Sequence, residues 1–571
     1  MRFRKLVPFL TALQLVHAVP SNRHADASFS CKCTPSESCW PTPAIWSKLN
    51  HTIDGRLFAT VPLGSPCHGP SFDENKCASI KEQWRFAPIH ANDPTSPMVP
   101  IFQNHTCDPF HLSSIPCNRS NLVEYYVNAS KPMHVQEAVN FARDNNVRLV
   151  IKNTGHDFLG RSTGKHALGI WTHYLNETTV LPSYKGSTYS GPALKMGAGT
   201  QASQAYRDAH GAGYRVVGGS CPTVGLAGGY TQGGGHGVLT SAYGLGADNV
   251  LEWEVVTAAG KIVTATPTKN SDLYWALSGG GGGNWGAVLS MTVKVYPEGP
   301  MSGGVLSFNL EPNTTAESFW ENVGLLLSGS TGLVDSGSSM IASITNSTVY
   351  AYIAGPNVDK KTLEDKMFYM TSRLNQSSIS YNFTIDTDPS YYDYFNRYFG
   401  PLPDGIWPVD HLMGNKLLPR SAFQSASKIK KLREVAKSIT SGNEWAISAV
   451  VVNAAASNKS SAVPANAVMP SWRNVLVQLT VYSNWDWKSN LEMSNRSDRL
   501  TNDIIPSLVA LAPETGIYAN EANYRQADWK KQFYGCTWGR LNDVKRKWDP
   551  STVFYTPLSA GSQLWEDKDE L

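Results

Sequence analysis

The sequence predicts an α+β protein of two or three domains. At 571 residues the chain is too long for one hydrophobic core, on a guide of about 150 residues per domain. Residues 118–298 mix helical and strand patterns around glycine-rich loops. Residues 299–495 alternate strand-like runs with a helix, which is typical of an antiparallel sheet backed by helices. The length and these two patterns together predict the class.

The amino-acid composition indicates which classes of partner the protein binds. The 49 Lys and Arg residues against 46 Asp and Glu give a net charge of +3, and no basic run of the nucleic-acid-binding type occurs. An aromatic content of 11% with 17 tryptophans suits an enzyme with a ring-lined pocket. We therefore expect a small-molecule substrate and neither a nucleic acid partner nor a metal. The sequence leaves the oligomeric state open.

Residues 1–18 have the pattern of a secretory signal peptide. Basic residues, including Arg4 and Lys5, precede an apolar run that ends at a small-residue cleavage pattern, Val16-His17-Ala18, so removal after Ala18 is expected. This run is too short to span a bilayer and no later run is long enough, so we expect no membrane span. The chain ends in Lys-Asp-Glu-Leu (568–571), an endoplasmic-reticulum retrieval signal, although an acidic tail could end this way by chance. Retention in the lumen is the prediction, with secretion as the alternative.

Acceptor sites for N-glycosylation agree with entry into this pathway. They begin at Asn50, Asn104, Asn118, Asn128, Asn176, Asn313, Asn346, Asn375, Asn382, Asn458 and Asn495.

Most cysteines lie near the N-terminus, which predicts a disulfide-stapled, loop-rich extension over residues 19–117. Seven of the nine cysteines are in this part of the chain: Cys31, Cys33, Cys39, Cys67, Cys77, Cys107 and Cys117. No paired CxxC occurs, which argues against zinc. Because seven is odd, we expect one of them to bridge to Cys536 and Cys221 to stay unpaired. The sequence does not determine the connectivity.

The elements of residues 118–298 are predicted from hydrophobic spacing and glycine turns. A helix is expected over 131–146, followed by a buried strand over 148–152 and a glycine turn that displays His156. Further along we expect a helix at 202–210, a hairpin at 250–256 and 261–265, a helix at 271–277 and a strand at 287–296. In 299–495 the expected strands are 305–310, 340–344, 446–452 and 475–481, with a helix at 427–438.

The stretch from Gly213 to Gly237, hereafter the glycine stretch, places Cys221 among ten glycines. Backbone without side chains can lie flat against a large ligand, so we interpret it as a flavin cradle with a reactive thiol. We assign no nucleotide-binding function to three other glycine motifs. Residues 281–286 match the dinucleotide fingerprint, but a helix precedes them and a strand follows, which reverses the required order. Residues 197–202 lack an acidic partner, and residues 160–165 are one residue short of a phosphate loop.

Four motifs carry a resemblance to a known family. They read KPMHVQEAVNFARDNNVRLVIKNTGHDFLGRSTG, GGSCPTVGLAGGYTQGGGHG, LSGGGGGNWGAV and FYGCTWGRLNDVKRKWDPSTVFYTP. In this order they resemble the FAD-linked oxidases of the vanillyl-alcohol oxidase superfamily, berberine bridge enzyme-like branch. The resemblance implies a PCMH-type FAD-binding domain of two subdomains over 118–298. It also implies a substrate domain over 299–495 and a berberine-bridge-like C-terminal segment over 496–571 that returns to the FAD domain.

The resemblance also implies a cofactor and its ligands. His156 matches the histidine that bonds the flavin 8α-methyl carbon, and Cys221 matches the cysteine that bonds C6, so a bicovalent FAD is expected. Residues 153–163 would hold the pyrophosphate, while 218–237 and 279–286 would line the isoalloxazine and adenine ends. The other cofactor-binding residues expected are Asn153, Thr154, Gly155, Asp157, Gly160, Arg161, Ser162, Gly219, Val224, Gly225, Gly228, Gly229, Gly233, Gly234, Gly235 and Asn523.

A reaction class follows from the same resemblance. Val224 matches the gate over the flavin, in the smaller form associated with oxidases, so O2 should be reduced to H2O2. Tyr524 is the candidate base, because Asn523 and Tyr524 match the Asn-Tyr pair that approaches the flavin in relatives. We expect two-electron oxidation of a small organic molecule in secondary metabolism: alcohol oxidation, oxidative cyclisation or desaturation. The alternatives are a secreted oligosaccharide oxidase and a catalytically silent flavin-binding protein.

Overall fold

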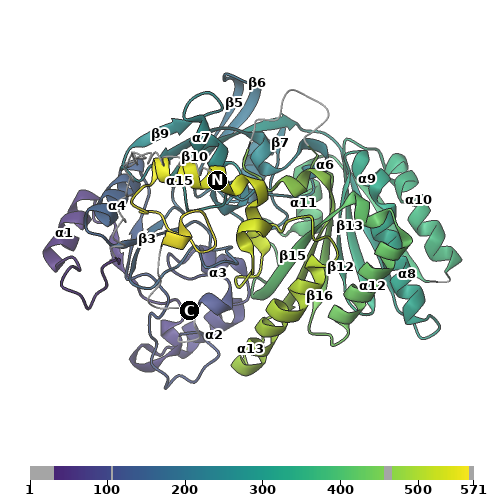
Figure 1. Cartoon of the computed structure of the whole chain (residues 1–571), viewed down its shortest axis with the longest axis horizontal. Helices are drawn as coiled ribbons and strands as arrows, with labels where there is room; N and C mark the ends of the chain where they lie inside the picture. Colours follow the sequence, from purple (N-terminus) through teal and green to yellow (C-terminus); the bar gives the residue numbers. More distant parts are fainter. Residues whose placement is uncertain (1–30, 104–106, 378, 456–465, 565–571) are drawn as a thin grey trace, which may run out of the picture.

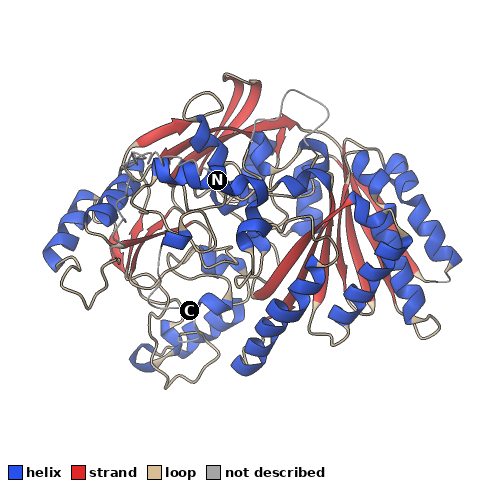
Figure 2. Cartoon of the chain, in the orientation of Figure 1, coloured by secondary structure: helices blue, strands red, loops and turns tan. Residues whose placement is uncertain are grey.

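The computed structural model describes residues 31–103, 107–377, 379–455 and 466–564. The predicted signal peptide, the C-terminal KDEL sequence and the glycosylation sites at Asn104 and Asn458 lie outside the described residues. Within these ranges the chain forms three sheets with helices around them, which confirms the predicted α+β class (Figures 1 and 2).

The first sheet has four strands in the order β1-β2-β4-β3. The strands are β1 (Leu57–Ala59), β2 (Tyr125–Asn128), β3 (Arg148–Lys152) and β4 (Ala167–Trp171). Strand β4 runs parallel to β2 and β3, whereas β1 is antiparallel to β2. Helix α4 (Pro132–Asp144) connects β2 to β3, and its buried residues recur at the helical spacing that predicted it. The loop after β3 carries His156.

The second sheet is antiparallel and has the order β5-β6-β10-β8-β9, with β7 also paired to β10. Its strands are β5 (Thr178–Lys185), β6 (Ser190–Gly197), β7 (Tyr214–Val216), β8 (Val250–Val256), β9 (Ile262–Ala265) and β10 (Ala287–Pro297). Its helices are α5 (Ala202–Gly211), α6 (Thr240–Tyr243) and α7 (Ser271–Leu277). The predicted hairpin, the two longer helices and the final strand are confirmed within one or two residues. The glycine stretch leaves this sheet after β7.

The third sheet is antiparallel, with seven strands in the order β14-β11-β13-β12-β16-β17-β15. The strands are β11 (Met301–Asn309), β12 (Ser339–Ile344), β13 (Thr348–Pro356), β14 (Tyr381–Asp388), β15 (His411–Pro419), β16 (Ala446–Val451) and β17 (Val475–Asn484). Its helices are α8 (Ala316–Gly329), α9 (Thr331–Asp335), α10 (Lys360–Gln376), α11 (Tyr391–Phe399) and α12 (Ala426–Thr440). Helices α8, α10 and α12 pack on one face of the sheet and build its hydrophobic core (Figure 1). The other face is turned toward the first two sheets.

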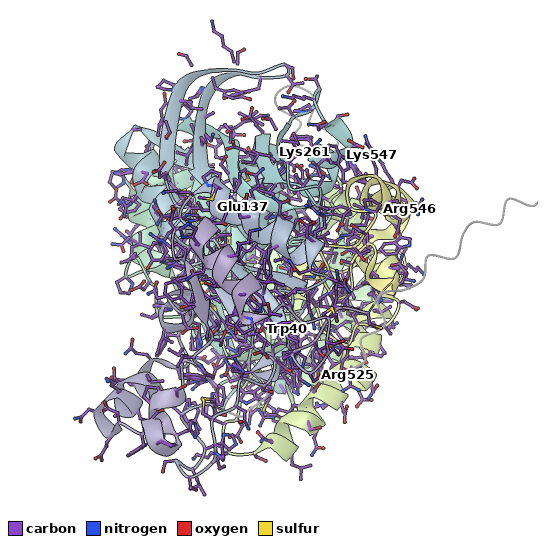
Figure 3. The ribbon with its side chains drawn as sticks, turned by 90° about the vertical axis from the view of Figure 1, so that its left-hand side faces the viewer. Trp40, Glu137, Lys261, Arg525, Arg546 and Lys547 are labelled. Carbon is purple, nitrogen blue, oxygen red and sulfur yellow. A yellow bond between two sulfur atoms is a disulfide. The ribbon has the colours of Figure 1, made fainter. Side chains whose placement is uncertain are left out.

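The C-terminal segment returns to the second sheet. Helices α13 (Asn490–Arg499) and α14 (Ile505–Val509) still pack on the third sheet, but α15 (Trp538–Trp548) contacts α7. Arg546 and Lys547, which are labelled in Figure 3, belong to α15. The Lys547 ammonium lies 2.6 Å from the carboxylate of Asp272 at the start of α7. This return confirms the expected path of the segment.

The N-terminal segment is more structured than expected. Helices α1 (Pro43–Thr52), α2 (Glu74–Gln83) and α3 (Ala87–Ala91) form there, and Trp46 of α1 is buried against Phe141 of α4. Strand β1 extends the first sheet, so this part of the chain belongs to the same core.

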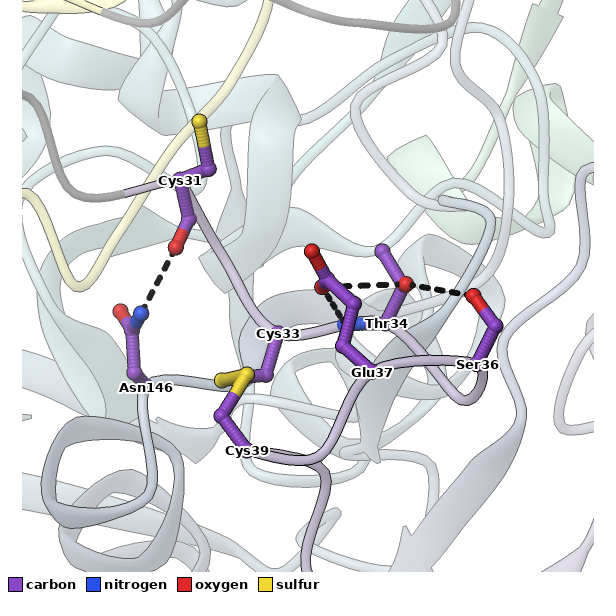
Figure 4. The surroundings of a disulfide bond; sticks show 7 residues. All are labelled: Cys31, Cys33, Thr34, Ser36, Glu37, Cys39 and Asn146. Atoms are coloured by element: carbon purple, nitrogen blue, oxygen red, sulfur yellow. Dashed lines mark hydrogen bonds between the residues drawn. A yellow bond between two sulfur atoms is a disulfide. The ribbon is translucent and has the colours of Figure 1, made fainter.

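The predicted bridge to Cys536 is wrong. The disulfides are Cys33–Cys39, Cys67–Cys77 and Cys107–Cys117. Each bridge joins cysteines only 6 or 10 residues apart, so six of the seven N-terminal cysteines pair locally and the seventh, Cys31, forms no bridge. Cys31 and Cys536 are free and exposed, and Figure 4 shows the Cys31 thiol pointing away from the neighbouring bridge. Cys221 is free, as expected.

Candidate functional site

His156 and Cys221, which are 65 residues apart in the sequence, lie side by side. The Cys221 Sγ is 3.8 Å from the His156 Nε2. Thr223 joins them: its Oγ1 is 2.7 Å from the His156 Nε2 and 3.5 Å from the Cys221 Sγ. The loop after β3 and the loop after β7 therefore present a histidine and a free thiol at one point, as the resemblance implies.

Both side chains are electrically neutral near neutral pH. Burial, with smaller contributions from the nearby Lys152 and His90, lowers the pKa of His156 to about 3. Burial raises the pKa of the Cys221 thiol, although hydrogen bonds with Thr223 act in the opposite direction. A neutral imidazole has a free lone pair and is a nucleophile, whereas a neutral thiol must first lose its proton. In this structure the sulfur is therefore the less reactive of the two groups.

Asn153 connects the histidine loop to the glycine stretch. Its Nδ2 donates to Thr172 Oγ1 at 3.2 Å and to the carbonyl of Ala198. A Cβ added at Gly225 or Gly228 would collide with the Asn153 side chain, so these glycines permit the close approach. The Asn153 Oδ1 is buried and has no hydrogen-bond partner among the described residues. It is thus an acceptor that a ligand could use.

The rest of the histidine loop is held by its own side chains. Asp157 accepts hydrogen bonds from the Ser162 backbone N–H at 2.7 Å and from the Ser162 hydroxyl at 3.1 Å. Gly160 has φ of +71°, and the Phe102 ring occupies the place of a Cβ. The Thr154 carbonyl accepts from Lys152. The turn at Gly155, with φ of +93°, then directs the chain toward His156.

Arg161 contacts the C-terminal segment. Its guanidinium donates to the carbonyl oxygens of Pro557 at 3.2 Å and Leu558 at 3.0 Å. It also lies against Gly281. The structure therefore uses Arg161 to join the histidine loop to the end of the chain.

The second half of the glycine stretch packs against residues 279–283. The backbone N–H groups of Gly279 and Gly281 donate to the Gln232 carbonyl at 3.0 and 2.7 Å, and Gly282 approaches Gly229. Gly233, Gly279 and Gly281 line a small pocket together with Tyr518, Phe533 and Tyr534 of the C-terminal segment. Gly234 and Gly235 have φ of +120° and +74°, so side chains are disfavoured where the chain turns.

The remaining predicted residues of this stretch also lie on the loop beside Cys221. The Gly219 carbonyl accepts from the Tyr206 hydroxyl at 2.7 Å. Val224 is partly exposed, and its carbonyl accepts from the Ala202 N–H at 2.9 Å at the start of α5. Gly229 is exposed and faces open space. A ligand could therefore approach its Cα, although its carbonyl already accepts from the Gly233 N–H at 2.9 Å.

The donor set of this site fits a flavin dinucleotide. Buried polar atoms of the glycine stretch have no hydrogen-bond partner within the described residues, although buried polar groups are normally paired. They are Ser220 Oγ, Tyr230 OH, Gln232 Oε1 and His236 Nδ1. Together with the glycine backbone beside His156 and Cys221, they match a polar heterocycle such as that of FAD. Among the described residues, no group of three histidine, cysteine or carboxylate side chains could hold a metal.

Sequence analysis did not identify a second candidate pair, formed by Glu521 and His236. Glu521 lies partly buried between the glycine stretch and the third sheet. Its Oε1 lies 2.8 Å from the His236 Nε2, and its Oε2 accepts from Gln478 Nε2 at 2.7 Å and Thr480 Oγ1 at 3.2 Å. Burial raises the pKa of Glu521, but these hydrogen bonds and the charge interaction with His236 outweigh it, so the pKa is lowered. An ionised carboxylate thus holds the imidazole.

Asn520, the preceding residue, contacts the glycine stretch itself. Its Nδ2 donates to the Gly229 carbonyl at 2.8 Å, and its side chain takes the space of a Cβ at Gly233. In the sequence, Asn520 and Glu521 appear only as an Asn followed by an acidic residue, three residues before Asn523. The Asn523-Tyr524 dipeptide was selected instead, because it matched the Asn-Tyr pair of the relatives.

The predicted pair itself has other partners. The Tyr524 hydroxyl forms a 2.9 Å hydrogen bond with Ser497 of α13, and its ring meets Phe102 edge-on with centroids 5.8 Å apart. The Asn523 Nδ2 donates to Thr501 Oγ1 at 2.9 Å. These contacts join the C-terminal segment to α13, whereas Asn520 and Glu521 face the glycine stretch. The roles given to Tyr524 and Asn523 stay predictions.

Residues 84–102, to which the sequence assigned no role, support the histidine loop. The Lys152 ammonium is buried behind Gly155 and donates to the carbonyls of His90 at 3.1 Å and Asp93 at 2.8 Å. Burial lowers the pKa of Lys152 to about 8. His90 is fixed by Ser96 at 2.8 Å and by the Trp84 carbonyl at 2.6 Å. The N-terminal segment thus closes the back of the site.

His90 should make the protein sensitive to acid. Burial lowers the pKa of His90 to about 4 from an ordinary value of 6.5. The unfolded chain therefore binds more protons below pH 6.5, so this stability is present above pH 6.5 and is lost as pH falls toward 4. The loss is on the order of 3 kcal/mol at 1.36 kcal/mol per pKa unit. We expect thermal unfolding of His90→Gln to depend less on pH in this window. The exposed His51→Gln should follow the wild type, and an unchanged slope in His90→Gln would contradict the assignment.

Comparison with known proteins identifies the relatives of this site. The profile of the family described as "FAD binding domain" matches residues 123–266, and that of "Berberine and berberine like" matches residues 517–560. FAD-linked oxidoreductase ZEB1 of Gibberella zeae is 40% identical over 95% of this chain and 94% of its own. Bifunctional decalin synthase calF of Penicillium decumbens is 39% identical over 99% and 98%.

Solved structures of flavoproteins are also similar to this chain. The VAO-type flavoprotein MtVAO615 of Myceliophthora thermophila is 39% identical and superimposes with a TM-score of 0.90, covering 94% of this chain and 98% of the other. A chitooligosaccharide oxidase is 17% identical with a TM-score of 0.64, so it shares the fold alone. Among the described residues, no helix is long and apolar enough to cross a membrane. The three disulfides are typical of an oxidising compartment such as the secretory pathway.

Proposed function

The chain belongs to the FAD-linked oxidoreductases of the vanillyl-alcohol oxidase and berberine bridge enzyme-like family, and on this premise we propose that it is an oxidase of a small organic molecule. The substrate loses two electrons and two protons, and O2 takes them up as H2O2. The observation that carries the proposal is the 3.8 Å approach of Cys221 Sγ to His156 Nε2 beside the unpaired polar atoms of the glycine stretch.

Attachment of FAD at both residues is part of this proposal. His156 is neutral, which leaves a ring nitrogen free to bond the flavin 8α carbon, and Cys221 is the one unpaired cysteine beside it. When bound, the isoalloxazine accepts two electrons from the substrate and passes them to O2. A covalent tether would keep the cofactor in place through many turnovers.

The proton released from the substrate needs an acceptor, and we assign it to the Glu521–His236 pair. Glu521 is ionised and can only accept hydrogen bonds, so the His236 Nε2 carries the shared proton and the His236 Nδ1 is an acceptor without a partner. A carboxylate that orients an imidazole is the usual form of a general base. The Thr480 hydroxyl, which donates to Glu521, belongs to β17 and so connects the pair to the third sheet, the proposed substrate side. Tyr524 is the competing candidate.

The oxygen reaction should depend on Val224. Its small, partly exposed side chain lies three residues after Cys221, where a larger residue would cover the approach to the flavin. In Val224→Ile we expect reoxidation by O2 to slow on the order of tenfold, or about 1.4 kcal/mol in activation free energy. Stopped-flow mixing of the photoreduced protein with O2 measures this without a substrate. The oxidase assignment fails if the wild type is reoxidised no faster than free flavin.

We propose that the substrate is an intermediate of secondary metabolism and that the protein oxidises it within the secretory pathway. Support comes from relatives with names such as decalin synthase, from the terminal KDEL sequence and from the predicted signal peptide. Lumenal retention favours biosynthesis over extracellular sugar oxidation. Anaerobic mixing of the yellow protein with alcohols, polyketides, alkaloids and sugars tests the proposal, because the substrate bleaches the flavin. Bleaching by oligosaccharides alone would support a secreted oligosaccharide oxidase, and no bleaching at all would support a silent flavoprotein.

A further inference from the structure

Two outer helices of the third sheet expose large apolar side chains. On α10, Phe368 is 69% exposed and Tyr369 is 52% exposed, and on α13, Leu491 is 75% exposed. The inward sides of both helices are buried in the core of the third sheet. Figure 1 shows α10 at the right edge of the molecule and α13 at its lower edge. The described residues therefore leave more than half of each of these three residues uncovered.

Each of these helices also carries an acceptor site for N-glycosylation on its exposed face. The sites are residues 375–377 (Asn-Gln-Ser) at the end of α10 and residues 495–497 (Asn-Arg-Ser) on α13, and both asparagines are exposed. Asn375 follows Phe368 by two helical turns, and Asn495 follows Leu491 by about one turn. Residues at these spacings lie on one face of a helix. The acceptor nitrogen and the exposed apolar group thus belong to the same surface stripe.

The direction of helical side chains brings an attached glycan onto the apolar groups. The Cα–Cβ bond of a helical residue tilts toward the N-terminus, so its side chain covers the surface over the preceding turn. Leu491 occupies that place for Asn495, and Phe368 lies one turn further back from Asn375, at about 10 Å along the axis. The first sugars on either asparagine would therefore lie over an apolar side chain and remove part of it from water.

Other acceptor sites differ from these two in their surroundings. Asn128 lies in β2, which is paired on both sides by β1 and β4, and its Oδ1 is buried. A glycan there would have to displace closely packed neighbours. Asn313, in the loop between β11 and α8, is exposed, but no large apolar residue between positions 300 and 340 is exposed. A glycan at Asn313 would therefore have no apolar side chain to cover.

We propose that Asn375 and Asn495 carry N-linked glycans, and that these glycans cover the apolar side chains of α10 and α13. The donor is a lipid-linked oligosaccharide of the secretory pathway. The asparagine Nδ2 bonds to C1 of the first sugar and loses one proton, the C–O bond to the lipid pyrophosphate breaks, and nothing is oxidised or reduced. Without the glycans the same side chains are apolar patches that favour self-association. This inference goes beyond the proposed function and does not depend on the chemistry of the flavin site.

Peptide mapping of the full-length protein from a fungal host tests which sites are occupied. Enzymatic release of N-linked glycans in heavy-oxygen water marks each occupied asparagine with the isotope, and mass spectrometry locates the mark. We expect the mark at Asn375 and Asn495 in most molecules, and no mark at Asn128. An unmarked Asn375 or Asn495 would overturn the proposal.

Matched variants test whether the glycans cover the apolar groups. Asn495→Gln and Asn375→Gln should each be retained longer than the wild type on a hydrophobic-interaction column and should form more oligomer at high protein concentration. Adding Leu491→Ser should cancel the shift of Asn495→Gln, and adding Phe368→Ser should reduce the shift of Asn375→Gln. Asn313→Gln, which removes an acceptor site without an apolar neighbour, should match the wild type.

Enzymatic removal of the glycans from the folded wild type separates this effect from a folding defect. It should produce the same longer retention, with an unchanged flavin content, because neither exposed helix face is part of the flavin site. Retention of Asn495→Gln equal to that of the wild type would contradict the covering role. A shift in Asn495→Gln that Leu491→Ser fails to cancel would also contradict it, because the exposed surface would then be a different one.

Discussion

Replacing Glu521 by Gln should reduce substrate turnover on the order of 100-fold or more, within the range that a general base contributes. The amide keeps the shape and can still contact Thr480, but it carries no negative charge to hold the proton on the His236 Nε2. The flavin content should stay unchanged. Because the pKa of Glu521 is lowered, its carboxylate keeps its charge from neutral pH down to the ordinary range of glutamate, so the rate difference between the wild type and Glu521→Gln should persist over that range. Anaerobic flavin reduction as a function of pH measures both effects.

Tyr524→Phe is the matched control for this experiment. The Tyr524 hydroxyl bonds Ser497 of α13, so its removal should lower stability and leave the rate of flavin reduction within a few-fold of the wild type. His236→Asn should resemble Glu521→Gln, since the two residues act as one unit. A Tyr524→Phe variant that loses turnover while Glu521→Gln keeps it would return the base to the tyrosine.

Removal of both His156 and Cys221 should abolish covalent flavin completely. Each single variant, His156→Ala or Cys221→Ala, should keep one attachment, because the side chains approach the same point from separate loops. Denaturing electrophoresis shows the attached flavin as a fluorescent band, and peptide mass analysis locates it. The double variant should release its colour on denaturation.

The two single variants should also differ in their pH dependence. In His156→Ala the only nucleophile is Cys221, whose pKa is raised by burial, so the thiolate fraction and the attachment rate should grow as pH rises. In Cys221→Ala the attachment runs through His156, which is neutral down to about pH 3, so the rate should be level over the neutral range. A single variant that releases all its flavin would show that the two attachments are not independent.

The sequence correctly predicted those helices and strands whose bounds are determined by local residue patterns. The strand Arg148–Lys152 and the helix Ser271–Leu277 have the bounds that their apolar spacing predicts. The meeting of His156 with Cys221 was also foreseen, but only through the resemblance, since no local rule joins residues 65 positions apart. The family, the α+β class and the FAD-linked oxidoreductase activity were predicted correctly in this way.

The missed features depend on tertiary contacts. Helix α1 lies among prolines and cysteines, and its buried Trp46 and Leu49 gain their meaning only from packing against α4. The cysteine count could not distinguish a long-range bridge from three local ones. Glu521 is recognisable as functional only when His236 and Gln478, far apart in the chain, are seen around it.

The contacts of Arg161 and Asn520 have a consequence for biosynthesis. Arg161 donates to the carbonyls of Pro557 and Leu558, and Asn520 donates to that of Gly229, so the chain's final sixth closes loops made from its first half. Chains emerge from the ribosome N-terminus first, and their domains fold as they appear. We therefore expect the cofactor site to close only once residues 512–571 have left the ribosome. A ribosome-bound chain without these residues lacks both Asn520 and the carbonyl groups that Arg161 contacts, so stable cofactor loading should follow their release.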